Sequence, residues 1–284
     1  MNHMIPAMQL PVEKLRPFEG HPFQVKDDAE MDQLVFSILT QGLLTPISGR
    51  PIENGEYEVI SGHRRLHACK KAGVETVPVL IYSLDRDAAT IAMVDSNLHR
   101  EKILPSEKAF AYKMKMDALK KQGKRTDLTS DQVGPKLSAK EISDEDSVSQ
   151  VKRYIRLTKL IPKLLAMVDE NKISFSVGVE LSYLTKTEQT DLFKFIEAEL
   201  CTPSLSQAQK LKKLSQEGKL NVEEISSIMK QPKPNQVLTV KILDDKISKY
   251  LKPTATVKEK EDFLAKAVEY YGKHLMRQKD RGAR

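Results

Sequence analysis

The stretch SGHRRLHACKKAGVETVPVLI, residues 61–81, decides how the N-terminal third of the chain folds. Within it, His63–Lys71 has the character of a helix, which Gly73 closes. Val77–Tyr82 is a continuous apolar run with β-branched residues, which is typical of a buried strand. Gly62 stands at the turn before the helix, where glycine allows a sharp change of chain direction. The stretch therefore predicts a tight turn, a helix and a strand in close succession.

The flanking sequence extends this alternation over the first hundred residues. Apolar residues at helical spacing predict a helix over Asp28–Gln41, and Gly42 ends it. Glu56–Ser61 alternates polar and apolar residues, as a half-buried strand does. An extended segment at Thr45–Arg50 and a helix at Asp85–Leu98 complete the set. We therefore expect a small α+β domain over residues 1–104.

Strand signals vanish after Pro105, which suits the first turn of a helix. The pattern predicts an all-helical domain over residues 105–230, interrupted by the breaker-rich stretch Gly123–Pro135. Its expected helices are Ser106–Gln122, Ser138–Ile142, Val148–Leu160, Pro162–Asn171, Ser176–Leu184, Thr187–Ala198 and Ser206–Glu217. Residues 231–284 then form a linker, with two prolines within Gln231–Asn235, and a small C-terminal α/β or helical segment. That segment begins with a predicted strand at Gln236–Ile242.

Composition narrows the class of protein. The 284 residues are 40% apolar and 30% charged, with a net charge of +7. Residues 1–100 contain 10 basic and 13 acidic side chains, whereas the remainder contains 36 and 26. Such asymmetry indicates a polyanionic partner for the later part, although solvated lysine-rich helices would give the same count.

Other features of the sequence bear on where the protein works. No run of about 18 apolar residues predicts a membrane span, and the N-terminus does not resemble a secretory signal. Two cysteines cannot build a disulfide framework, so we expect a cytoplasmic protein.

The turn at Gly62 is the first candidate site. The free N–H groups at the start of the next helix form an anion site, and Arg64 and Arg65 would oppose the helix dipole there unless an anion were bound. Arginine also matches phosphate oxygens with two parallel hydrogen bonds. The alternative is a plain turn glycine followed by two solvated arginines. A zinc site at His63 and His67 is disfavoured because no acidic residue lies between them.

The stretch SNLHRE, residues 96–101, is the second candidate. The Asn97 amide oxygen suits a hard cation, and Arg100 suits a phosphate. Asn and Arg are also ordinary residues at a helix end. Taken with the turn at Gly62, the stretch predicts a phosphate and magnesium site built from separate elements.

The third candidate is the helix expected at Val148–Leu160. Its apolar face comprises Val148, Val151, Tyr154 and Ile155, and its candidate DNA contacts are Ser149, Gln150, Lys152, Arg153 and Arg156. Preceded by a short helix and a turn, this is the pattern of a helix-turn-helix recognition helix. The alternative is an amphipathic surface helix whose polar face is basic.

The order of these segments resembles the ParB family of partition proteins, over roughly residues 9–200. The segments that carry the resemblance are HPFQVKDD (21–28), LTPISGRP (44–51), SGHRRLHACKKAGVETVPVLI (61–81), SNLHREKILPSEKA (96–109) and SVSQVKRYIRLTKL (147–160). The resemblance implies a ParB/sulfiredoxin-like N-terminal domain followed by a helix-turn-helix domain. It also implies a homodimer that binds a palindromic, centromere-like site on double-stranded DNA. CTP and Mg²⁺ would close the dimer as a sliding clamp, and a ParA-type Walker ATPase would move the complex on a plasmid or nucleoid.

Carried over by position, the resemblance gives each site residue a role. Gly62, Arg64 and Arg65 would hold the triphosphate, Asn97 would ligate magnesium, and Arg100 would support the phosphates. Arg50 and His63 would complete the nucleotide site.

Two departures from the family pattern concern turnover. The family commonly has Glu where this chain has His63 and Ser96, so we expect nucleotide binding with weak or absent hydrolysis. A sulfiredoxin-type enzyme is disfavoured because no cysteine stands at the turn. A helix-turn-helix transcription regulator or nucleoid-associated factor stays open as the alternative.

The C-terminal segment is open between two roles. Dimerisation would use Phe263, Leu264, Val268 and Leu275, whereas nonspecific DNA binding would use Lys273, Arg277, Lys279 and Arg281.

Overall fold

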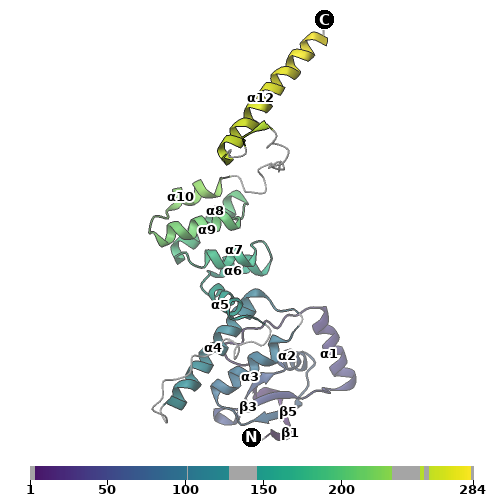
Figure 1. The fold of residues 1–284 in the computed structure, drawn as a ribbon. Coiled ribbons are helices and arrows are strands. Elements are labelled where there is room, and N and C mark those ends of the chain that lie inside the picture. The colour runs from purple at the N-terminus through teal and green to yellow at the C-terminus, as the bar shows by residue number, and fades with distance from the viewer. Residues whose placement is uncertain (1–3, 101, 128–145, 232–249, 253–255, 283–284) are drawn as a thin grey trace. The chain divides into compact units, whose positions relative to one another are not determined.

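The computed structural model describes residues 4–100, 102–127, 146–231, 250–252 and 256–282. The chain forms two compact units, Met1–Gln231 and Pro232–Arg284, and each is considered by itself (Figure 1). Among the described helices, none combines the length and the apolar character needed to cross a bilayer.

The first unit begins with a five-stranded mixed sheet of order β1-β5-β3-β4-β2. The strands are β1 (Met4–Pro11), β2 (Leu15–Arg16), β3 (Ile47–Pro51), β4 (Tyr57–Ser61) and β5 (Thr76–Tyr82). β5 lies antiparallel to β1 and parallel to β3, while β4 lies antiparallel to β3 and parallel to β2. Short 3₁₀ turns at Val12–Lys14 and Glu53–Gly55 complete the connections. The sequence pattern did not predict β1, which contains two prolines, or β2, which has only two residues. Proline is tolerated in β1 because β1 is an edge strand of the sheet.

Three helices accompany the sheet: α1 (Ala29–Gln41), α2 (His63–Lys71) and α3 (Arg86–Leu98). The Asp28 carboxylate accepts the Met31 N–H and so begins α1, and Asp85 begins α3 in the same way. Beneath α1 and α2, a buried core contains Leu15, Met31, Ile47, Val59, Leu66, Val77 and Val79. The predicted helices and central strands are confirmed, and so is the α+β class of this region.

Helix α4 (Pro105–Asp127) packs against α3 and against α5 (Val148–Leu157), and it therefore joins the sheet region to the later helices (Figure 1). The expectation that Gly123–Pro135 breaks the helix was wrong for its first residues, since α4 continues to Asp127. One glycine costs a helix only about 1 kcal/mol, and its lysine and arginine neighbours are good helix formers. The rest of that stretch and the predicted helix at Ser138–Ile142 lie outside the described residues.

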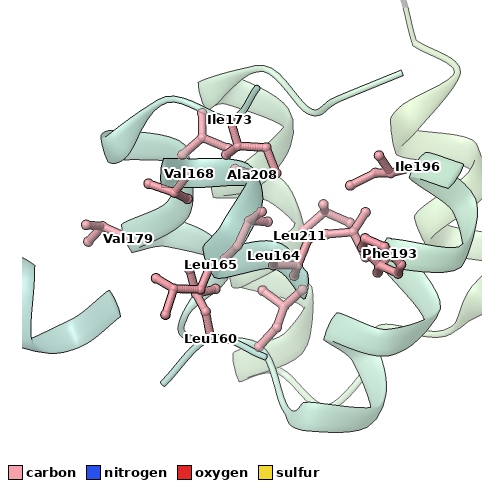
Figure 2. Packing of buried hydrophobic residues seen from close by; sticks show 14 of the residues in the cluster. Leu160, Leu164, Leu165, Val168, Ile173, Val179, Phe193, Ile196, Ala208 and Leu211 are labelled. Atoms are coloured by element: carbon pink, nitrogen blue, oxygen red, sulfur yellow. The ribbon is translucent and has the colours of Figure 1, made fainter. Parts of the chain in front are cut away.

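The remaining helices of this unit share one apolar core. They are α6 (Pro162–Asp169), α7 (Phe175–Leu181), α8 (Lys186–Glu199), α9 (Leu205–Gln216) and α10 (Val222–Met229). Figure 2 shows Leu164, Leu165, Leu211 and Phe193 meeting between these helices. The sequence did not predict α10, although Asn221 caps it and Ile225 and Ile228 complete the core.

In the second unit, the described residues form one long helix, α12 (Val257–Gly282). The Tyr250 ring stacks on Phe263 with 6.4 Å between ring centroids. Val268 is exposed, and its role in dimerisation stays a prediction. The predicted strand Gln236–Ile242 lies outside the described residues. The division into residues 1–104, 105–230 and 231–284 stays a prediction, because α4 packs on both sides of the first boundary.

Candidate nucleotide and DNA sites

The turn between β4 and α2 has the geometry that only glycine adopts easily. Gly62 has φ +103°, and a Cβ there would approach the Arg65 guanidinium to 3.1 Å. Arg65 Nη1 donates hydrogen bonds to the carbonyl oxygens of Thr45 (2.7 Å) and Pro46 (2.6 Å). Burial lowers the pKa of Arg65. Arg65 therefore fastens the segment before β3 to the start of α2.

Arg64 turns the other way, toward the start of α1. Its Nη2 lies 3.4 Å from Asp28 Oδ1 and 3.4 Å from Glu30 Oε2. These carboxylates supply the negative charge that arginine needs in the first turn of a helix. Arg64 also lines a cavity of about 740 Å³, which is large enough for a small-molecule ligand.

The cavity brings together three stretches that are separate in the sequence. Arg64 comes from α2, Arg100 follows α3, and Lys26 precedes α1. The complete lining is Gln24, Lys26, Asp28, Glu30, Arg64, Arg100, Lys102, Ile103, Leu104 and Glu107. The lining thus carries four cationic side chains and three carboxylates, and two of those carboxylates lie beside Arg64. Such an excess of positive charge suits a polyanion.

Glu107 holds one wall of this cavity in place. Its side chain is buried, and its two carboxylate oxygens accept the backbone N–H groups of Gln24 (2.8 Å) and Leu104 (3.0 Å). In the next position back, Ser106 donates its backbone N–H (2.9 Å) and its hydroxyl to the Asp169 carboxylate of α6. The first turn of α4 therefore contacts both the cavity and the helical part of the unit.

His63 occupies the first position of α2 as a neutral side chain. Its Nε2 accepts the Phe18 N–H (3.2 Å), and its ring lies against the His21 ring, tilted by 32°, with 3.7 Å between centroids. Burial, together with the positive charges of His21 and Arg100, lowers the pKa of His63 from 6.5 to about 3. Burial also lowers the pKa of His21, whose Nδ1 pairs with the Phe23 carbonyl. The His63 imidazole is therefore uncharged at neutral pH.

The structure does not bring every predicted nucleotide residue to this cavity. Asn97 and Ser96 end α3, where the Asn97 amide N–H and the Ser96 hydroxyl both donate to the Met93 carbonyl. Asn97 is not among the lining residues. Arg50 lies in β3 and lines a different cavity; its Nε donates to Glu58 (2.8 Å), a buried carboxylate that also binds Arg86.

Of the lining residues, the sequence predicted only Arg64 and Arg100 as site residues, and those it missed include Lys26, Lys102 and Glu107. All three stand within the quoted stretches HPFQVKDD and SNLHREKILPSEKA, so their place in those stretches was the signal that could have identified them. Within the described residues, no group of three or more His, Cys, Asp or Glu side chains is arranged to hold a metal ion.

The predicted recognition helix forms as α5, with Ser147 as its N-cap. Ser149 and Lys152 are exposed, while Gln150 accepts a hydrogen bond from Arg153 (3.3 Å). Arg153 and Arg156 are turned toward α7 rather than extended into solvent. Arg153 donates to the Ser176 hydroxyl (2.8 Å) and lies over the Phe175 ring. Val151 is buried, which confirms the predicted apolar face at that position.

Part of the chain is similar in sequence to known proteins. The nucleoid occlusion protein of Bacillus cereus (strain B4264) is 40% identical over 105 residues, which are 37% of this chain and 36% of that protein. The chain thus spans little more than a third of that relative's length.

Solved structures give a further comparison. The C-terminally truncated chromosome-partitioning protein ParB from Caulobacter crescentus, complexed to the centromeric parS site, is 22% identical with a TM-score of 0.43. That match covers 72% of this chain and 98% of the other. The same protein complexed with CTP-gamma-S is 24% identical with a TM-score of 0.31, over 67% of this chain and 98% of the other. The family model of the ParB N-terminal domain matches residues 2–98. This part of the chain, about a third of its length, is therefore similar to the N-terminal domain of the ParB family.

Proposed function

We propose that this chain is a DNA-binding partition protein whose N-terminal domain binds CTP with Mg²⁺. One observation carries the proposal: Arg64 and Arg100, from two separate sequence stretches, line the same cavity together with Lys26 and Lys102. Arginine and lysine are the side chains that bind phosphate oxygens, and a triphosphate needs several of them at once.

The nucleotide phosphates would replace the protein's own carboxylates at Arg64. Its contacts with Asp28 and Glu30 are both 3.4 Å long, which is beyond the range of a strong charge-assisted hydrogen bond. Arg65 would act indirectly, by holding the Thr45–Pro46 segment against the start of α2. Asp28 and Glu30 line the cavity and offer oxygen ligands to magnesium. Asn97, to which the resemblance assigns that role, is outside the lining and would have to turn toward the nucleotide.

Turnover of the nucleotide would be weak or absent. Where the family commonly has Glu, His63 accepts a backbone hydrogen bond and stays neutral, and Ser96 donates to a carbonyl. Neither side chain carries a carboxylate, the group that would position water or a metal ion. Binding through Arg64 and Arg100 does not depend on either of them.

The DNA-binding function rests on α5 and on the basic character of the later part of the chain. Ser149, Gln150 and Lys152 are the α5 side chains best placed to reach a base edge, and Arg153 would have to leave Ser176 to do so. A homodimer would bind the two halves of a palindrome, and a ParA-type ATPase would act on the complex. This places the protein in the cytoplasm, on a nucleoid or plasmid.

A second candidate function is that of a nucleoid-associated factor or transcription regulator with no role in segregation. The similarity to a nucleoid occlusion protein favours it. This alternative keeps the DNA-binding helix and does not require a partner ATPase.

Calorimetric titration tests the nucleotide site. Purified protein is titrated with CTP, ATP, GTP and UTP in the presence of magnesium, and we expect selective binding of CTP. Arg64→Ala should abolish the binding. Arg16→Ala is the matched control, since Arg16 is an exposed arginine of the same domain that pairs with Glu56. Equal binding by wild type and Arg64→Ala would refute this site, and no binding of any nucleotide would leave the regulator as the better assignment.

A further inference from the structure

Two cations stack on one tyrosine beside the predicted DNA-binding helix. The Arg156 guanidinium carbon and the Lys212 Nζ each lie 3.9 Å from the centroid of the Tyr183 ring. Arg156 belongs to the last turn of α5, Tyr183 follows α7, and Lys212 belongs to α9. Two positive charges thus lie within about 8 Å of each other, where they repel in the absence of an anion.

Among the described residues, a carboxylate pairs with only one of these two cations. Lys212 Nζ pairs with Glu180 at 3.0 Å. Arg156 instead donates to the Ser182 hydroxyl (3.2 Å) and the Ser182 carbonyl (3.0 Å), both of which are uncharged. These two bonds use two of the five N–H donors of the guanidinium. The cluster therefore keeps a net positive charge and donors for a further ligand.

The surroundings fix the two cations in place before any ligand arrives. Ser182 is buried and its hydroxyl donates to the Val179 carbonyl, so the acceptor for Arg156 is rigid. Tyr183 itself is 39% exposed, and Lys212 is 26% exposed at its side chain. Ordered cations at a partly exposed surface bind an anion at a lower entropic cost than mobile ones do.

We propose that Arg156 and Lys212, held on Tyr183, bind one phosphate of the DNA backbone next to the bases that α5 reads. The inference rests on the DNA binding proposed above and adds α9 to the interface. Backbone phosphate is the anion expected here because Arg156 lies on the same helix as Ser149 and Lys152. Contacts with phosphates fix the position of a protein on the duplex, whereas base contacts give sequence preference.

Glu180 has a distinct part in this arrangement. It competes with phosphate for Lys212, so the ion pair must open or be shared when DNA binds. Removing the Lys212 charge and removing the Glu180 charge should therefore change DNA affinity in opposite directions. A purely structural ion pair would make both changes harmful to stability and neutral for binding.

The test compares Lys212→Gln, Lys212→Arg and Glu180→Gln in the full-length protein. Binding to a duplex selected from a random library, and to an unrelated duplex, is followed by fluorescence anisotropy over a range of salt concentrations. Lys212→Gln should weaken binding to both duplexes about five-fold. It should also reduce the slope of log affinity against log salt by about 1. Glu180→Gln should strengthen binding to both duplexes. Lys212→Arg, which keeps the positive charge, should bind them as the wild type does.

Lys219→Gln is the matched control, because Lys219 is an exposed lysine that also pairs with a glutamate, Glu217, at 3.0 Å. Thermal melts of each variant confirm that it folds. Unchanged affinity and salt slope in a folded Lys212→Gln variant would overturn the inference while leaving DNA binding itself intact. Weakened binding by Glu180→Gln would overturn it as well. Failure of the wild type to bind any duplex would instead remove the proposed DNA function, and this inference with it.

Discussion

Acidification should destabilise the N-terminal domain through His63. This imidazole lies against the His21 ring with 3.7 Å between centroids, and its Nε2 accepts the Phe18 N–H at 3.2 Å. Protonation of Nε2 would replace that hydrogen bond by repulsion between two N–H groups. Burial and the nearby charges of His21 and Arg100 hold the pKa of His63 at about 3 instead of 6.5.

The size of the effect follows from the difference between the two pKa values. Below pH 6.5 the unfolded chain binds a proton at His63 that the folded chain rejects until about pH 3. Stability is therefore complete above pH 6.5 and falls as the pH decreases through this window. The slope approaches about 1.4 kcal/mol per pH unit, so the loss between pH 7 and pH 5 is about 2 kcal/mol. Burial also lowers the pKa of His21, which adds to the loss in the same direction.

Urea denaturation of the full-length chain at pH 7 and pH 5, followed by far-ultraviolet circular dichroism, measures the loss. His63→Gln removes the titrating group and should make the free energy of unfolding of this domain less dependent on pH by about 2 kcal/mol. His67→Gln is the matched control, because His67 lies on the same helix but is exposed and pairs with Asp27 at 3.0 Å. It should retain the wild-type dependence of stability on pH.

Carboxylates that lose their charge at low pH affect the wild type and His63→Gln equally, so the difference between these two proteins measures the contribution of His63. If His63→Gln showed the same loss of stability between pH 7 and pH 5 as the wild type, His63 would not be buried as a neutral side chain.

Two further predictions concern packing and charge in the same unit. Gly178→Ala should lower the melting temperature, because the added Cβ would lie 2.8 Å from Val168 Cγ2; overpacking costs about 1–3 kcal/mol, which exceeds the gain in helix propensity of about 1 kcal/mol. Glu58→Gln should reduce the free energy of unfolding at pH 7 by about 3 kcal/mol, measured by urea denaturation, since it leaves Arg50 and Arg86 without their shared carboxylate. A variant of either kind with wild-type stability would contradict the corresponding contact.

The sequence predicted local structure best where the local signals agree. The bounds of α2, His63–Lys71, were predicted as they occur, because Gly62 and Gly73 mark its two ends. Strand β1 was missed because Pro6 and Pro11 argue against a strand and only its position at a sheet edge permits them. Edge position is a property of the whole sheet, so a local pattern could not reveal it.

The candidate site was predictable by residue type but not by arrangement. Arg64 and Arg100 were both expected at a phosphate site, and they do line one cavity. Glu107 joins them because it stands in the first turn of α4, and α4 packs on α3, an arrangement that no short stretch of sequence specifies. Arg50 was placed near the nucleotide by resemblance, yet its contact with a buried carboxylate holds it elsewhere.

Arg64 and Arg65 show how one local conflict has two structural solutions. Both stand in the first turn of α2, where the helix dipole disfavours positive charge. Arg65 meets two carbonyl oxygens at 2.7 and 2.6 Å and becomes part of the framework, whereas Arg64 meets two carboxylates only at 3.4 Å. The hydrogen bonds of Arg65 are short and the contacts of Arg64 are long. An incoming phosphate would therefore displace the partners of Arg64 without breaking the bonds by which Arg65 holds the start of α2. The proposed site would therefore bind an anion while the turn that builds it stays intact.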